Sequence, residues 1–184
     1  MNRGRIFFMG NPWPEGHAIK EFRWTAHRRG PEIWFGLHLE SADYYAERGI
    51  EDDESMNYAS DWQAPIVWGN YHSCIISSDE WHQGGFPVFL AAEFNAERID
   101  ELSCQVDSLP RGLREGYESR AFHIYLLVHD SVVDHQIDFS RISGTDCFDI
   151  VWKGRIALSY AGDFEPKYSF RAEIEGVKLP VLAA

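Results

Sequence analysis

The 184-residue sequence has no uninterrupted hydrophobic run close to the roughly 18 residues that a membrane-spanning helix requires. The apolar stretch near the amino terminus, residues 6–9, is too short for the core of a secretory leader, so none is expected. Only three cysteines are present, and Cys74, Cys104 and Cys147 form no CxxC motif. An odd number of scattered cysteines is typical of a reducing compartment, which predicts a cytoplasmic protein.

The familiar signatures of catalysis and cofactor binding are also missing. None of the eight histidines occurs in an HxH or HExxH pattern, which argues against the common zinc sites. The sequence contains no GxSxG or SxxK nucleophile motif and no glycine-rich phosphate loop. It therefore predicts no metal and no cofactor, and it favours a protein that is not an enzyme.

Positive charge is scarce and unevenly placed. The chain has 17 lysines and arginines against 29 acidic residues, a net charge of -12, which argues against binding to nucleic acid or to anionic membranes. Eight acidic residues and only Arg48 as a base lie in residues 40–61, whereas residues 1–30 hold six bases and two acids. The acidic segment 40–61 is expected to be a solvated loop or to steer the chain toward a basic partner.

Hydrophobic periodicity is strongest in residues 148–160, where apolar side chains or glycine occupy every even position and polar residues occupy most odd ones. A period of two predicts a long β-strand with one buried face. The alternation continues through Gly154 without a change of phase, which a single-residue bulge would have caused. Gly154 is therefore predicted to be a bend or a packing gap.

Residues 17–27 and 32–40 alternate in the same way, and the four residues between them predict the loop of a hairpin. The predicted register places Glu21 opposite His38 on the outer face of the hairpin. Trp34 is predicted to lie on that outer face as well.

One helix is predicted at about residues 96–107, because Asn95 is a suitable cap and Ile99, Leu102 and Val106 mark one helical face. Most of the remaining chain alternates as short strands separated by turns. The predicted fold is mainly β, or α+β by content: an antiparallel β-sandwich or strongly curved sheet of seven to nine strands with this one helix packed on it. Residues 1–184 are expected to form a single domain.

The outer face of the hairpin is the candidate site that the sequence favours. His38 and Glu40 share a strand face with Glu21 predicted across from them, and such a group could hold a cation or act as an acid and a base. An outward Trp34 could stack on a sugar ring or anchor a protein interface. The alternatives are ordinary surface pairs for the polar residues and a covering element over Trp34.

Three functional hypotheses follow. The first is a non-enzymatic protein-binding module of the inhibitor or immunity type, steered to a basic partner by its acidic segment, with Trp34 or Trp62 as anchors. The second is a carbohydrate or small-ligand binding protein that uses the hairpin face, and the third is a metal-dependent hydrolase at the same face. The predicted binding residues are Glu21, Trp34, His38, Glu40, Glu51, Asp52, Asp53 and Glu54.

Overall fold

The computed structural model describes residues 4–49, 57–80, 84–110, 112 and 117–183. The strands are β1 (Gly4–Phe8), β2 (His17–Arg29), β3 (Glu32–Ser41), β4 (Ile75–Ser77), β5 (Phe86–Leu90), β6 (Ser103–Val106), β7 (His123–Tyr125), β8 (His129–Arg141), β9 (Cys147–Ala157), β10 (Tyr168–Lys178) and β11 (Leu182–Ala183). The described helices are short: α1 (Pro65–Gly69), α2 (Ala96–Ile99) and 3-10 turns at Asp61–Gln63, Ala91–Glu93, Tyr117–Ser119 and Ser159–Ala161.

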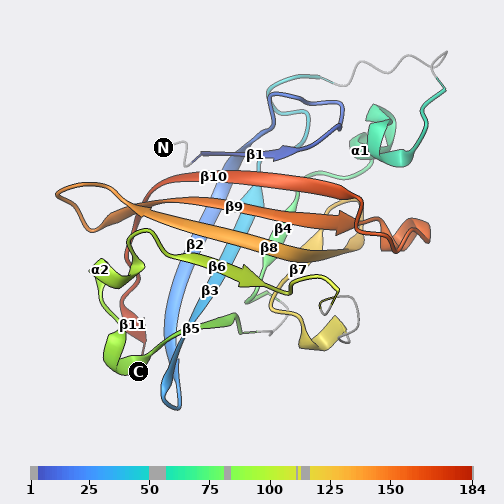
Figure 1. Cartoon of the computed structure of the whole chain (residues 1–184). Helices are drawn as coiled ribbons and strands as arrows, with labels where there is room; N and C mark the ends of the chain where they lie inside the picture. Colours follow the sequence, from blue (N-terminus) through green and yellow to red (C-terminus); the bar gives the residue numbers. More distant parts are fainter. Residues whose placement is uncertain (1–3, 50–56, 81–83, 111, 113–116, 184) are drawn as a thin grey trace.

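Eight strands close into an antiparallel barrel in the order β2-β1-β10-β9-β8-β7-β4-β3, because β3 pairs back with β2. Strands β5 and β6 lie outside this ring, where they extend β3 and β8, and the short β11 adds to β2 in parallel. Figure 1 shows the long β2–β3 hairpin crossing the β8–β9–β10 meander at a steep angle. The prediction of a mainly β, strongly curved antiparallel fold is confirmed, and the curvature reaches closure.

Strand β9 confirms the prediction made from its periodicity up to Ala157; the predicted range continued to residue 160, but Tyr160 lies in the 3-10 turn that follows and is 71% exposed. It lies between β8 and β10 in the ring, and Phe148, Ile150 and Trp152 on its even positions are all buried. A Cβ atom on Gly154 would come within 2.6 Å of the Phe170 ring and 2.9 Å of the His135 ring. Gly154 is therefore a packing gap filled by its neighbours; it is paired with Phe170 of β10, while the pairing with β8 shifts register opposite it.

The helix predicted at residues 96–107 is wrong over most of its length. The cap is correct, since the Asn95 side chain accepts a hydrogen bond from the Arg98 N–H at 2.9 Å, but α2 ends after a single turn. Glu101 then adopts a left-handed φ of 61°, and residues 103–106 form strand β6. In residues 103–106 every second side chain faces the core, as in a strand. The pairing of this segment with β8 determines its structure, although its apolar residues are also spaced as in a helix.

The hairpin is confirmed but its predicted register is wrong. The loop contains only two residues, Gly30 and Pro31, because Arg29 still pairs with Glu32. Gly30 has a φ of 57°, which suits the first position of a tight hairpin turn. The shorter loop moves the pairing by two residues, and a bulge between Ile19 and Glu21 shifts it again.

Aromatic side chains fill the inside of the barrel. Trp24 and Trp152 belong to the core, at 7% and 0% exposure. Trp13 is only 4% exposed, and Trp62, considered above as an anchor for a partner, is only 1% exposed. Both are buried because segments outside the strands fold over one end of the barrel, where Trp62 stacks on Tyr168 with ring centroids 4.3 Å apart.

Candidate functional site

The barrel is closed unevenly along its length. Strands β4 and β7 complete the ring through only three residue pairs. Beyond them β3 pairs with β5 and β8 pairs with β6, but β5 and β6 are not paired with each other in the described part of the chain. A groove of about 710 Å³ lies along these two strands, and we call it the β5–β6 groove; its lining includes Arg29, Trp34, Pro87, Leu102, Gln105 and Arg120.

The outer edge of β6 presents backbone groups to this groove. The Leu102 carbonyl accepts a hydrogen bond from the Phe139 N–H at 2.9 Å, so these two residues form a hydrogen-bonded pair. In an antiparallel ladder such pairs alternate with pairs whose backbone groups point away from the partner strand. The N–H and C=O groups of Ser103 and Gln105 therefore point away from β8, and both residues are exposed.

Trp34 lines the same groove and is held in a defined position. The guanidinium of Arg29 lies 4.4 Å from its ring centroid, and its indole N–H donates to the Glu32 carboxylate at 3.1 Å. The backbone of Trp34 is opposite Pro87 of β5. Pro87 lacks an N–H, which suits a strand that is paired only with β3 among the described residues.

Cys104 also lines the groove but is not a reactive thiol. Burial, together with the nearby Asp138 carboxylate, raises the pKa of Cys104 to about 12. The thiolate that nucleophilic chemistry needs is therefore essentially absent at neutral pH.

A second, smaller cavity of about 110 Å³ lies where the loop after β1 meets the loop after β3, and we call it the His17 chamber. His17 at the start of β2 is only 3% exposed. Its ring lies against Tyr44 and Trp13, with centroid distances of 5.1 and 5.5 Å, and nearly parallel to Trp68 at 6.4 Å. One end of the barrel thus carries an imidazole with aromatic walls.

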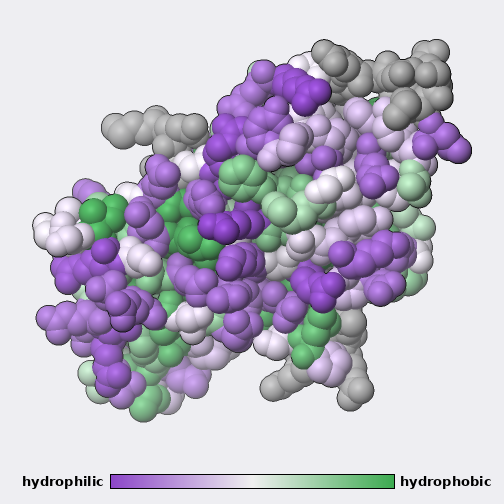
Figure 2. Space-filling view, turned by 45° about the horizontal axis from the view of Figure 1, so that its top comes forward, coloured by the Kyte–Doolittle hydropathy of each residue, from purple (hydrophilic) through white to green (hydrophobic). Residues whose placement is uncertain are grey.

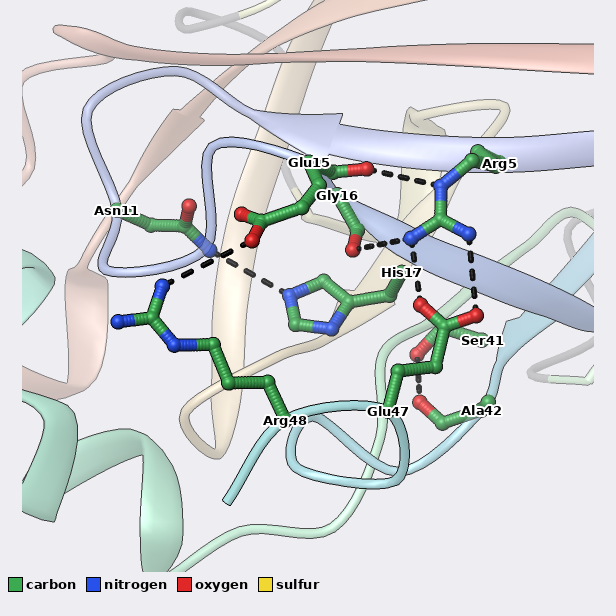
Figure 3. A network of polar contacts seen from close by, with 9 residues as sticks. All are labelled: Arg5, Asn11, Glu15, Gly16, His17, Ser41, Ala42, Glu47 and Arg48. Carbon is green, nitrogen blue, oxygen red and sulfur yellow. Dashed lines mark hydrogen bonds and ion pairs between the residues drawn. The ribbon is translucent and has the colours of Figure 1, made fainter. Parts of the chain in front are cut away.

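Two ion pairs join the loops around this chamber. The Arg5 guanidinium contacts both carboxylate oxygens of Glu47, at 2.6 and 3.1 Å, and also donates to the carbonyls of Glu15 and Gly16. Arg48 lies 3.7 Å from the Glu15 carboxylate. Figure 3 shows the His17 ring enclosed by these side chains and by Asn11.

The His17 imidazole is neutral in this setting. Burial is the main cause that lowers the pKa of His17 to about 4, and the nearby Arg5 charge acts in the same direction. The Asn11 side-chain amide lies 3.5 Å from Nε2 and can only donate through its nitrogen, so Nε2 accepts. The ring proton is then on Nδ1, close to the Tyr44 backbone.

The corrected register changes the cross-strand partners of the polar residues that the sequence placed together, but keeps those residues on one face of the hairpin. Glu21 lies opposite Glu40, and Arg23 rather than Glu21 lies opposite His38. Glu40 pairs with Lys20 at 2.6 Å, and Glu21 pairs with Arg23 at 3.3 Å. Trp34 lines the β5–β6 groove, whereas His38 and Glu40 do not.

His38 is covered by the segment that follows β4 and is only 4% exposed. Its Nδ1 lies 3.0 Å from the Ser77 hydroxyl and 4.0 Å from the Glu80 carboxylate. Burial is the main cause that lowers the pKa of His38, with the Arg23 charge second. Ser77 is itself buried and its oxygen accepts from the N–H groups of Asp79 and Glu80, so it stabilises a turn and is not a free nucleophile.

The acidic segment 40–61 is described only in part. Glu51, Asp52, Asp53 and Glu54 lie outside the described residues. Within the described part, Glu47 is neutralised by Arg5. Figure 2 shows that hydrophilic residues predominate on one face of the molecule, with hydrophobic residues gathered in smaller areas.

Two kinds of feature are absent from the described residues. No group of three or more His, Cys, Asp and Glu side chains in that part of the chain could hold a metal ion. Among the same residues, no helix has the length and apolar character needed to cross a bilayer.

Two features of these sites escaped sequence reasoning. The edge of β6 was missed because residues 103–106 were assigned to a helix. The inward position of His17 was missed because the bulge at Lys20 reverses the faces of β2, so that His17 and Ile19 point inward before it and Phe22 after it. Ile19 and Lys20 break the alternation of apolar and polar residues along the strand, and this break is the sign of the bulge.

Comparison of the chain with protein families, with curated proteins and with solved structures finds no significant match.

Proposed function

We propose that this chain is a non-enzymatic protein-binding module that takes an extended segment of its partner into the β5–β6 groove. The observation that carries the proposal is the outward edge of β6, where Ser103 and Gln105 direct backbone donors and acceptors toward a groove that also contains Trp34. An extended peptide could add to this edge as a further strand.

The groove has the composition that such recognition needs. Backbone hydrogen bonds to a strand edge provide affinity, and pockets beside the edge select side chains. Trp34 offers a large aromatic surface with a fixed orientation, the type of residue that dominates binding energy in many interfaces. The groove volume of about 710 Å³ is in the range of known ligand sites, roughly 300–1,000 Å³.

The charge of the chain favours a basic partner. A net charge of -12 attracts cationic proteins over a distance and raises the rate of encounter more than the final affinity. We assign the steering to the acidic segment 40–61 and the contact to the groove. The three free cysteines, of which Cys74 is buried, accord with a cytoplasmic location for this interaction.

Selection of random peptides displayed on phage tests the proposal, followed by titration of the enriched peptides with the purified chain. The proposal expects peptides that bind in extended form and lose at least about tenfold in affinity with Trp34→Ala. Tyr160→Ala is the matched control, because Tyr160 is 71% exposed and does not line the groove. Failure to enrich peptides, or equal affinities for the two variants, would contradict it.

A second candidate function is the binding of a small ligand in the His17 chamber. The observation in its favour is a cavity of about 110 Å³ at one end of the barrel that combines aromatic walls with a neutral imidazole. A panel of small organic molecules, followed by tryptophan fluorescence in the parent and in Trp13→Phe, tests it. A ligand that changes the tryptophan fluorescence of the parent and raises its unfolding temperature would support this function. If no molecule of the panel does so, the function is contradicted.

A further inference from the structure

The outer face of the β6-β8-β9-β10 sheet carries a row of long polar side chains. Gln105 is paired with Gln136, Gln136 with Lys153, and Lys153 with Arg171. Neighbouring strands in a sheet are about 4.8 Å apart, so the row spans on the order of 15 Å. These four residues line a groove of about 480 Å³ that also includes Arg155, and we call it the outer-face groove.

Positive charge is concentrated in this groove. Lys153, Arg155, Lys167 and Arg171 all line it, whereas Asp134 is the one acidic residue among the described residues of its lining. The whole chain has only 17 basic residues against 29 acidic ones. The local charge is thus opposite in sign to that of the molecule.

Two of these four cations form no ion pair with a described residue. Lys167 pairs with Asp163 at 2.6 Å and Arg171 pairs with Glu173 at 2.7 Å. Neither Lys153 nor Arg155 forms an ion pair with any residue that the structure describes, although Lys153 is directly opposite Arg171. Like charges that face each other across a sheet destabilise it unless an anion lies between them.

We propose that the outer-face groove binds a phosphate group, either as a free phosphorylated metabolite or as inorganic phosphate. Arg155 and Arg171 provide guanidinium groups that match two phosphate oxygens at once, and Lys153 provides a compact charge between them. Ser169, opposite Arg155 on β10, supplies a hydroxyl donor at the same place. This site shares Gln105 with the β5–β6 groove, but its cations do not line that groove, and the proposal does not depend on the proposed function.

The geometry favours a small anion over the carboxylates of a second copy of the chain. The unpaired charges lie on one strand, two residues apart, and line the same groove. A single multiply charged anion can contact both, because side chains two residues apart on a strand share a face. Carboxylates from another copy would instead bring the remaining acidic charge of that molecule close to this one.

Isothermal titration with pyrophosphate, at an ionic strength matched with sodium chloride, tests the site. We expect saturable binding of one pyrophosphate per chain and a matching rise in the unfolding temperature. The affinity should fall at least about tenfold in Lys153→Gln and in Arg155→Gln, since each removes one charge-assisted contact. Both side chains point outward from the sheet, so circular dichroism should show the barrel intact.

Arg98→Gln is the control, because Arg98 is exposed on α2, already pairs with Glu93 at 3.6 Å, and does not line the groove. It should bind pyrophosphate as the parent does. A second arm repeats the titration with inorganic phosphate and with a phosphate monoester. Tighter binding of the monoester would indicate that the site also contacts the organic group of a phosphorylated metabolite. The proposal would be overturned if pyrophosphate showed no saturable binding, or if Arg98→Gln lost as much affinity for it as the groove variants do. It would also be overturned if the chain formed a dimer that pyrophosphate does not affect and that Lys153→Gln dissociates.

Discussion

At the scale of single residues, His17 links the His17 chamber to the stability of the fold. The pKa of His17 is about 4 in the folded chain, below the ordinary 6.5 of histidine, because burial disfavours the imidazolium. Between pH 4 and pH 6.5 the unfolded chain therefore binds a proton on His17 that the folded chain does not bind. The stability due to neutral His17 is complete above pH 6.5 and is lost as the pH falls toward 4.

Urea unfolding at pH 7.5 and pH 5 measures this effect. The parent should lose more free energy of unfolding between the two values than His17→Gln, by about 2 kcal/mol, because glutamine stays uncharged. His135 and His38 also have lowered pKa values and contribute equally to both proteins. An identical pH dependence in parent and variant would show that His17 is not buried as a neutral ring.

Gly154 provides a residue-scale test of packing. Alanine at this position would bring its Cβ within 2.6 Å of the Phe170 ring and 2.9 Å of His135, whose Nδ1 already accepts the Trp152 indole N–H. Gly154→Ala should lower the free energy of unfolding by about 1–3 kcal/mol. Gly49→Ala is the control, because no described atom lies within 4 Å of the place that its Cβ would occupy; a cost equal to the control would contradict the packing gap.

At the scale of elements, successive backbone N–H groups of β6 point in opposite directions, and proline substitutions test this arrangement. The N–H of Cys104 points to β8, whereas that of Gln105 points to the groove. Cys104→Pro should therefore break the ladder and cost more than about 2 kcal/mol, while Gln105→Pro should cost far less. Thermal unfolding of the two variants decides it, and the reverse order of stabilities would show that β6 presents the other edge.

The strands that alternate cleanly were predictable, and the elements set by long-range pairing were not. Strand β9 has a buried face at every even position, so its sequence alone specifies its type and its orientation. Residues 99, 102 and 106 fit a helix equally well locally, and only the unpaired edge of β8 makes residues 103–106 a strand. The register of the β2–β3 hairpin depends on a two-residue turn and on a bulge, and the only local sign of the bulge is the broken alternation at Ile19 and Lys20.

The same limits explain what was predicted of the candidate site. Trp34 was identified because an aromatic residue on the polar face of a strand is unusual, and it does line the largest of the cavities described above. Glu21, His38 and Glu40 share one face of the hairpin as predicted, because a shift of two residues keeps each side chain on its face, but the residues directly opposite one another differ from the prediction. Closure of the barrel, which leaves β5 and β6 beside a shared groove, involves pairings between segments far apart in the sequence.

At the scale of the whole molecule, the net charge of -12 predicts salt-sensitive association with the basic partner. Neutralising Glu51, Asp52, Asp53 and Glu54 as amides should slow association about tenfold at low salt, with little change in the rate of dissociation. Stopped-flow measurements over a range of salt concentrations provide the readout. The control neutralises four exposed acids elsewhere, Glu97, Glu101, Glu165 and Glu175.

An equal effect of the two sets of substitutions would assign steering to the net charge rather than to the acidic segment. No effect of either set would contradict a basic partner. Because the Debye length is about 10 Å at 0.1 M salt, the difference between the sets should disappear at high ionic strength.

The most direct test of the central claim is the exchange rate of individual backbone amides in β6, measured by NMR with and without a selected peptide. The peptide should slow exchange at Ser103 and Gln105, whose N–H groups point toward the groove, whereas the Cys104 amide should stay protected by β8 in both states. Slowed exchange elsewhere, with Ser103 and Gln105 unchanged, would show that partners bind the barrel at a different surface.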